Sequence, residues 1–331
     1  MVSNSFEVID LPRIRHFIGM KDALDAVRSA YGQLARGEVQ QPAVIGMEIH
    51  HTGAEVHAKA AYIHGSAHFS VKLTGSFPEN LRRHRSNIAG EVFVFDASSG
   101  DLAAILRDQG YLTELRTAAA GALSAQLLAR PDVERIAVIG TSIQARAQFE
   151  ALSLVRQPGS VAVFGRTQKH AEDYAAEMSA RYDIPFEVST SVEAAVSEAD
   201  LVITVTSARE ILVRSEWIRP GTHITAVGSD MPGKQELDPA LLKRAKVVVD
   251  RLEQCATQGE LQHALGSGLM TEQDVHAQIG EIVVGTKQGR TSEEEITIAD
   301  FTGVGALDAA MANLLLSRIT TVQDNGSWRL R

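Results

Sequence analysis

The stretch Ile136-Ala137-Val138-Ile139-Gly140-Thr141-Ser142-Ile143-Gln144-Ala145 reads as an apolar strand that runs through a small-residue turn into a helix. Such a turn leaves free backbone N–H groups and a positive helix end facing a pyrophosphate, so it predicts a dinucleotide-binding site. The match to G-x-G-x-x-G/A is imperfect because Ser142 stands at the second glycine. The residues expected to contact the cofactor here are Gly140, Thr141, Ser142, Ile143 and Gln144.

A regular alternation of apolar runs and helical patterns follows this turn. Runs of this kind are typical of strands that are buried on both faces of a parallel sheet. The runs are 161–164, 201–205, 223–228 and 246–250. We therefore predict an α/β fold with a Rossmann-type, doubly wound parallel sheet over residues 121–304.

The first part of the chain has a different pattern. Four apolar runs between residues 43 and 96 follow one another with only turn-like gaps, which predicts a smaller α+β domain with a mostly antiparallel sheet. Helices are expected over residues 20–37 and 113–128. A last helical pattern, from Gly305 to about Ile319, is expected to return to this domain, which would then comprise residues 1–120 with 305–331.

Composition excludes several classes of function. A formal net charge of −9 over 331 residues argues against a nucleic-acid or anionic-membrane surface. The single cysteine, Cys255, excludes an intrachain disulfide and a multi-cysteine metal site. No apolar run approaches the roughly 20 residues that span a bilayer. We expect a cytoplasmic protein with no membrane or nucleic-acid partner.

The end of the second nucleotide-domain strand bears on the choice of cofactor. NAD-selective proteins usually present an acid to the ribose hydroxyls at this point, whereas this chain has Arg166 and Thr167. A guanidinium and a hydroxyl suit a 2′-phosphate, which favours NADP(H) over NAD(H), although Arg166 could also stack on the adenine without selectivity. The remaining predicted cofactor contacts follow later strands: Thr206, Ser207, Val227, Gly228, Ser229 and Lys234.

Three charged residues are candidates for chemistry. Lys72 shares a strand face with Ser70 and Thr74, and it could also be a solvated edge charge. Arg116 lies near the start of an Ala-rich helix and could simply pair with an acid. Asp230 follows a buried strand, at the sheet edge where open α/β proteins bind ligands, and could instead cap the turn that follows it.

Five motifs together carry a family resemblance: Arg116-Thr117-Ala118-Ala119-Ala120, the 139–145 turn, Val227-Gly228-Ser229-Asp230-Met231-Pro232-Gly233-Lys234-Gln235-Glu236-Leu237, Gln258-Gly259-Glu260-Leu261 and Thr302-Gly303-Val304-Gly305. In this order they resemble the ornithine cyclodeaminase/mu-crystallin family, from about residue 44 to residue 316. The resemblance implies a homodimer in which the first domain binds substrate and forms the dimer contact, while the second holds NAD(H) or NADP(H).

The resemblance also implies roles for single residues. Lys72 is similar to the family's active-site lysine and Arg116 to its carboxylate-binding arginine. Asp230 resembles the acid that handles the amino or imino nitrogen, and Glu48 one that cyclodeaminases place near the substrate's amino groups. Paired N–H bonds from Arg116 to a substrate carboxylate would orient the reacting carbon, while Asp230 could relay a proton.

One departure concerns the second strand. Many relatives have a methionine-proline pair where this chain has Lys59-Ala60, an arrangement that resembles the ectoine-utilisation branch. Lys59 shares a strand face with His57. If that face lines the substrate pocket, Lys59 and His57 are candidates for binding a second carboxylate of the substrate or another polar tail. Otherwise Lys59 lies at the surface. The histidines near this strand lack a metal-ligand spacing, so we predict no metal.

These observations support three hypotheses. The first is an NAD(P)H-dependent reductase or dehydrogenase that interconverts a small α-imino acid, or an imino-dicarboxylate such as iminosuccinate, and the α-amino acid. The second is a cyclodeaminase that converts an ornithine-like diamino acid to a cyclic imino acid with NAD+ and releases ammonia. The third is a non-catalytic ligand-binding protein of the mu-crystallin type.

Overall fold

The computed structural model describes residues 6–83 and 88–324. The chain divides into two compact units. Unit 1 comprises residues 1–116 and 304–331, and unit 2 comprises residues 117–303. Helix α4 (Tyr111–Leu128) contains the first boundary, which falls after Arg116.

Unit 1 contains a seven-stranded sheet in the order β1-β7-β6-β5-β4-β2, with β3 paired to β4. Its pairs are antiparallel except β1 with β7. The strands are β1 (Glu7–Asp10), β2 (Val39–Gln40), β3 (Ile45–Ile49), β4 (Ala54–Ile63), β5 (His68–Ser76), β6 (Ile88–Asp96) and β7 (Leu102–Arg107). The consecutive apolar runs of the sequence therefore form neighbouring strands of one sheet.

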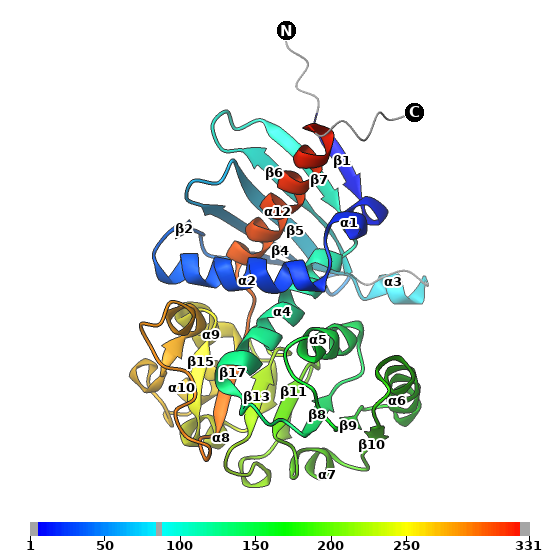
Figure 1. The fold of residues 1–331 in the computed structure, drawn as a ribbon, viewed down its shortest axis with the longest axis vertical. Helices are drawn as coiled ribbons and strands as arrows, with labels where there is room; N and C mark the ends of the chain where they lie inside the picture. Colours follow the sequence, from blue (N-terminus) through cyan, green and yellow to red (C-terminus); the bar gives the residue numbers. More distant parts are fainter. Residues whose placement is uncertain (1–5, 84–87, 325–331) are drawn as a thin grey trace. The chain divides into compact units, whose positions relative to one another are not determined.

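Helices cover one face of this sheet. They are α12 (Gly305–Asp324), with α1 (Leu11–Phe17) and α2 (Met20–Ala35) packed against it, whereas the short α3 (Glu79–Arg82) follows β5. Helix α12 packs on β4, β5 and α2, and Figure 1 shows it crossing the sheet. Side chains that point toward α12, such as Ser70 and Val94, are buried, because successive residues of a strand alternate between faces.

Unit 2 is built on an eight-stranded sheet in the order β10-β9-β8-β11-β13-β17-β15-β16. Figure 1 labels its strands from β10 to β15. All its pairs are parallel. The strands are β8 (Arg135–Ile139), β9 (Ser160–Phe164), β10 (Phe186–Val188), β11 (Leu201–Thr204), β13 (His223–Ala226), β15 (Lys246–Val249), β16 (Ala277–Gln278) and β17 (Thr297–Asp300). A separate parallel pair is formed by β12 (Arg209–Val213) and β14 (Gln235–Leu237).

The central strands of unit 2 are buried on both sides. Two apolar clusters flank them, one around Val202 and Ile224 and the other around Val138 and Ile203. Besides α4, the helices are α5 (Ile143–Ser153), α6 (Gln168–Tyr182), α7 (Val192–Val196), α8 (Pro239–Arg244), α9 (Leu252–Gln258), α10 (Leu261–Gly266) and α11 (Ile279–Val283). The predicted α/β fold with a parallel sheet is confirmed.

No helix in the described part of the chain combines the length and the apolar character that a membrane span requires. Within residues 6–83 and 88–324, no three His, Cys, Asp or Glu side chains are grouped so that they could hold a metal ion.

Candidate functional site

Strand β5 places Lys72 inside unit 1. The register pairs Lys72 with Lys59 of β4 and with Val92 of β6, so these three side chains lie on one face of the sheet. This is the face that α12 covers, and only 4 % of the Lys72 residue surface is exposed. The interpretation of Lys72 as a solvated edge charge is therefore wrong.

Lys72 belongs to a buried cluster of charges. Its Nζ donates to Oδ1 of Asp308, in the first turn of α12, at 2.8 Å and to Oγ1 of Thr113 at 3.3 Å. Nε of Arg116 donates to the same Asp308 oxygen at 2.6 Å. Two cations thus share one carboxylate oxygen, which suits the cluster to an anionic ligand.

The environment of Lys72 weakens its affinity for a proton. Burial, followed by the positive charge of Arg116, lowers the pKa of Lys72 to about 7 from an ordinary value of 10.5, although Asp308 acts in the opposite direction. Charge attraction from Arg116 and Lys72 keeps the pKa of the buried Asp308 carboxyl below its ordinary value, against the effect of its burial. The amine is consequently poised to change its charge near neutral pH.

Asp308 is the functional candidate that sequence reasoning missed. Its Oδ2 atom is buried and accepts no hydrogen bond from any residue that the structure describes. The available signal was an acid on the first turn of the helix that follows Thr302-Gly303-Val304-Gly305. Its contacts could not be read from the sequence, because Lys72 and Arg116 are 236 and 192 residues away.

The other predicted substrate residues lie on the same sheet face but in more open positions. His57 is two residues before Lys59 on β4, so the two side chains lie on the same face of the sheet. Its register partners are Thr74 of β5 and Gly46 of β3. Glu48 follows on that face of β3, and 68 % of its side chain is exposed, with His50 Nδ1 3.5 Å from its carboxylate. The structure therefore buries Lys72 and leaves Glu48 in solvent.

The predicted phosphate turn in unit 2 connects β8 to α5. Gly140 has a φ of 121°, and a Cβ there would lie 2.8 Å from the carbonyl oxygen of Val205, so this position requires glycine. Ser142, with a φ of −77°, adopts ordinary extended backbone and caps α5 by accepting from Ala145 N at 3.4 Å. The missing second glycine is explained, because the backbone here can carry a side chain.

Two further features of this turn, the contacts of Arg146 and the side chain of Gln144, fit a bound dinucleotide. Nη1 of Arg146 donates to the carbonyl oxygens of Thr141 and Ser142, at 2.9 and 3.2 Å, which holds the turn in place. Gln144 Nε2 is buried, and no described residue accepts a hydrogen bond from it. The exposed Ile143 begins the helix. A free donor beside a helix N-terminus fits the phosphates or ribose of a dinucleotide.

The remaining predicted cofactor residues lie at the same, carboxyl edge of the sheet. Arg166 and Thr167 follow β9 and are exposed. Thr206 and Ser207 follow β11, and residues 227–229 follow β13, its neighbour. The pyrophosphate turn follows β8, which lies between β9 and β11. These positions match the crevice where parallel sheets bind dinucleotides.

Asp230 lies just beyond β13 on the surface of unit 2. Its side chain is 49 % exposed and pairs with Lys234, whose Nζ is 2.6 Å from Oδ1 of Asp230. The Ser229 hydroxyl donates to the carbonyl oxygens of Lys234 and Gln258 at 2.8 and 3.3 Å. Lys234 therefore contacts the predicted proton-transfer residue, an interaction that the sequence did not suggest.

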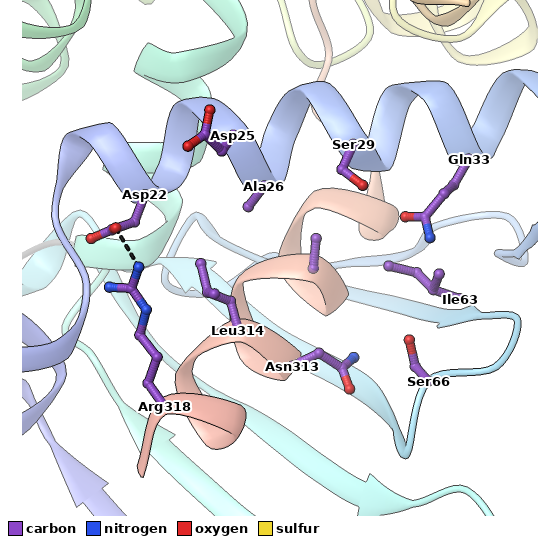
Figure 2. Close-up of a pocket in the computed structure, with 11 residues that line it drawn as sticks. Asp22, Asp25, Ala26, Ser29, Gln33, Ile63, Ser66, Asn313, Leu314 and Arg318 are labelled. Carbon is purple, nitrogen blue, oxygen red and sulfur yellow. Dashed lines mark hydrogen bonds and ion pairs between the residues drawn. The ribbon is translucent and has the colours of Figure 1, made fainter. Parts of the chain in front are cut away.

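A separate hollow lies between α2 and α12 of unit 1 (Figure 2) and has a volume of about 380 Å³. Asp22 and Arg318 form an ion pair at one end of it, and Gln33 and Ser66 lie toward the other end. It shares no lining residue with the Lys72 cluster. We therefore do not assign substrate binding to this hollow.

The sequence matches the ornithine cyclodeaminase/mu-crystallin family over residues 8–322. The chain belongs to this family. It is 36 % identical over 310 residues to the alanine dehydrogenase of Archaeoglobus fulgidus, covering 93 % of both chains. It is 33 % identical over 296 residues to the iminosuccinate reductase of Paracoccus denitrificans, covering 89 % of this chain and 90 % of the relative.

Solved structures of relatives have the same fold. The Δ1-pyrroline-2-carboxylate reductase of Thermococcus litoralis, in complex with NADH and L-proline, superposes with a TM-score of 0.91 at 28 % identity, covering 96 % of this chain and 98 % of that one. An archaeal alanine dehydrogenase dimer with bound NAD gives 0.90 at 34 % identity, with 98 and 99 % coverage. A lysine cyclodeaminase gives 0.84 at 27 % identity, with 96 and 93 % coverage.

The comparisons confirm the predicted family and the predicted class of enzyme, an NAD(P)-dependent oxidoreductase for amino or imino acids with cyclodeaminase as the alternative. They leave the individual substrate open, because relatives of similar identity act on different ones. The bound cofactors of the solved neighbours are NADH and NAD.

Proposed function

We propose that this protein is an NAD(P)H-dependent reductase that interconverts a small α-imino acid and the corresponding α-amino acid. The observation that carries the proposal is the cluster of Lys72, Arg116 and Asp308. It brings two buried cations to one oxygen of a single carboxylate, which is an arrangement suited to a substrate carboxylate. Dehydrogenases and reductases of this chemistry are among the relatives.

Each residue has a distinct role in the proposed reaction. Arg116 binds the α-carboxylate and fixes the orientation of the substrate. Lys72 adds positive charge at that carboxylate, and Asp308 positions both cations. The nicotinamide supplies a hydride to the imine carbon, and Asp230 transfers the proton that the nitrogen gains. The overall change is imino acid, NAD(P)H and a proton to amino acid and NAD(P)+.

Lys59 points to the subclass of substrate. It lies directly opposite Lys72 in the register, and its charge lowers the pKa values of both Lys72 and Asp308. A cation beside the site of the α-carboxylate favours a second carboxylate on the substrate. We propose that an imino-dicarboxylate such as iminosuccinate is accepted, with His57 one position further along the same strand.

We further propose that NADP(H) is preferred over NAD(H). The end of β9 offers Arg166 and Thr167 in exposed positions and no carboxylate for the ribose hydroxyls. The solved neighbours hold NADH and NAD, so this preference would distinguish the chain from them.

The outer face of the unit 1 sheet supports the formation of a homodimer. Its side chains include Ile45, Met47 and Leu73, which are 65, 56 and 42 % exposed and lie on the face opposite Lys72. Contiguous exposed apolar surface of this kind marks protein interfaces. We propose that a second copy of the chain covers this face; the archaeal alanine dehydrogenase of the same fold is a dimer.

A cyclodeaminase is the second candidate. Glu48 lies on the sheet face of Lys72, where its carboxylate can receive a substrate's side-chain amine. Lysine cyclodeaminase has the same fold. In that reaction the hydride returns to the substrate, so the cofactor shows no net change.

Absorbance of the reduced nicotinamide tests these alternatives. NADPH and NADH are each mixed with the protein, ammonia and pyruvate, glyoxylate or oxaloacetate, and in parallel NAD+ is mixed with ornithine or lysine. Oxidation of NAD(P)H, fastest with oxaloacetate, is expected. Ammonia release from a diamino acid without a change in absorbance would establish the cyclodeaminase, and cofactor binding without either reaction would support a ligand-binding protein.

A further inference from the structure

Glu236 of β14 joins two loops of unit 2. Its side chain is fully buried, and its two carboxylate oxygens accept from different segments: Oε1 from Thr206 N at 2.6 Å and Oε2 from Gly228 N at 3.0 Å. Thr206 lies two residues after β11, and Gly228 lies two residues after β13. One carboxylate therefore ties the ends of two neighbouring parallel strands together.

Gly228 shows how closely this carboxylate approaches the backbone. A Cβ at residue 228 would overlap the Glu236 carboxylate and the carbonyl oxygen of Thr206. The contact therefore requires glycine for its lack of a side chain.

The position of Glu236 is itself fixed by two other buried acids. Glu260 accepts from the backbone N–H groups of Glu236 and Leu237 at 2.8 and 3.0 Å. Asp300, at the end of β17, accepts from Glu260 N and Leu261 N, both at 3.0 Å. Each carboxylate holds the backbone that carries the next one, so the series runs from the end of β17 to the loops after β11 and β13.

The loops held by Glu236 lie on the nicotinamide side of the proposed cofactor site. The pyrophosphate turn follows β8. Arg166, which is proposed to contact the adenosine ribose, follows β9, the neighbour of β8 on one side. Strands β11 and β13 lie on the other side of β8, so the nicotinamide half of a dinucleotide would lie over their ends. Asp230 is only two residues beyond Gly228.

We propose that Glu236 is a positioning residue: by bridging Thr206 N and Gly228 N, it sets the loops that hold the nicotinamide half and the loop that carries Asp230. This inference rests on the proposed function, because it assumes a bound nicotinamide dinucleotide. A buried acid thereby determines, through two backbone N–H groups, where the reacting ring lies.

Glu236→Gln tests the proposal, because glutamine has the same shape but turns an NH2 group toward one of the two N–H donors. The control is Asp200→Asn. Asp200 is also buried, and its Oδ2 accepts from Glu134 N and Arg135 N at 3.0 and 2.9 Å, but it precedes β11, at the opposite edge of the sheet. Both variants lose a carboxylate that holds two backbone donors. Asp200→Asn also weakens the ion pairs of Asp200 with Arg130 and Arg219, so its loss of stability should be at least as large, but only Glu236→Gln changes the cofactor edge.

Dissociation constants are measured for NADH and for ADP-ribose, which lacks the nicotinamide, together with the melting temperature. If the wild type prefers NADPH, then NADPH and 2′-phospho-ADP-ribose are used. For Glu236→Gln we expect the Kd of the intact dinucleotide to rise about tenfold, the scale of one charged hydrogen bond, and the Kd of the ADP-ribose fragment to change less than about twofold. Asp200→Asn should lower the melting temperature and leave both constants unchanged.

Three results would count against the proposal. Equal losses for dinucleotide and fragment in Glu236→Gln, or lower stability with both constants unchanged, would overturn the positioning role alone. A wild type that binds neither ligand would overturn the proposed function first, and this inference with it. If Glu236→Gln does not fold, Glu236→Asp, which keeps the charge but is one methylene too short to bridge both donors, should show the same selective loss to a smaller degree.

Discussion

The two units bury charged groups in different ways. In unit 1, Lys72 and Arg116 share one oxygen of Asp308, and the other oxygen receives no hydrogen bond from the described residues. In unit 2, Glu260 and Asp300 each use both oxygens to accept from consecutive backbone N–H groups. The first cluster therefore has hydrogen-bonding capacity left over at Asp308, whereas the acids of the second group have both oxygens occupied.

The difference distinguishes buried groups that bind a ligand from buried groups that hold the backbone in position. A buried group with incomplete partners is costly, so its presence indicates a ligand that completes it. A buried carboxylate that accepts from backbone on both oxygens instead fixes the course of the chain. On this basis we assign substrate binding to the cluster in unit 1 and loop positioning to the acids of unit 2.

The largest effect is expected from Asp230→Asn. The change removes the proposed proton relay from a half-exposed side chain, so kcat should fall about 10²- to 10⁴-fold. Cofactor affinity and melting temperature should stay near those of the wild type. Steady-state kinetics with the keto acid and ammonia that the absorbance assay identifies would measure this, and near-normal turnover would exclude Asp230 from proton transfer.

Asp308→Asn and Asp300→Asn compare the two kinds of buried acid directly. Asp308→Asn removes the carboxylate that accepts from both Lys72 and Arg116 and should lower the free energy of unfolding by about 3 to 5 kcal/mol. Asp300→Asn, which keeps one acceptor oxygen for its two backbone donors, should cost about 1 to 3 kcal/mol. Urea unfolding measures both values, and equal losses would contradict the distinction between the units.

Arg166→Ala examines the adenosine end of the cofactor site. If Arg166 binds a 2′-phosphate, the loss of its charged hydrogen bonds should weaken NADP(H) binding by about 1.5 to 3 kcal/mol and leave NAD(H) binding nearly unchanged. Fluorescence titration with NADPH and NADH provides the measurement. Equal weakening of both cofactors would show that Arg166 contributes no selectivity.

The pH dependence of stability should differ in sign between the units. Burial lowers the pKa of Lys72 to about 7, so its contribution to stability is present above about pH 10.5 and is lost as the pH falls toward 7. Burial raises the pKa of Asp300 to about 7, so its contribution is present below about pH 3.8 and is lost as the pH rises through 7. Between the ordinary and the shifted pKa of each group, the free energy of unfolding changes by about 1.4 kcal/mol per pH unit.

Variants isolate these two slopes. Relative to the wild type, Lys72→Met should remove a rise in stability between pH 7 and 10, and Asp300→Asn should remove a fall between pH 4 and 7. Urea unfolding across this pH range checks both signs. Parallel curves for the wild type and the Lys72→Met variant would mean that Lys72 keeps an ordinary pKa.

Much of the fold could be predicted because its signals are local. The apolar runs that form β8, β9, β11, β13 and β15 were recognised, with ends that differ from the structure by no more than two residues. Strand alternation also placed Lys72 on the face of Ser70 and Thr74, as the register shows. What it could not tell was whether that face is covered, and α12, which covers it, comes more than 200 residues later.

The sequence by itself determined the parallel nucleotide-binding sheet and the glycine turn, because each depends on residues that are near one another along the chain, and the family motifs made Lys72, Arg116 and Asp230 candidates. Only the tertiary structure decided that Asp308 pairs with both Lys72 and Arg116, and that Glu236 bridges Thr206 and Gly228. These contacts arise when distant segments are packed together, where burial converts an ordinary acid into a group whose partners determine its role.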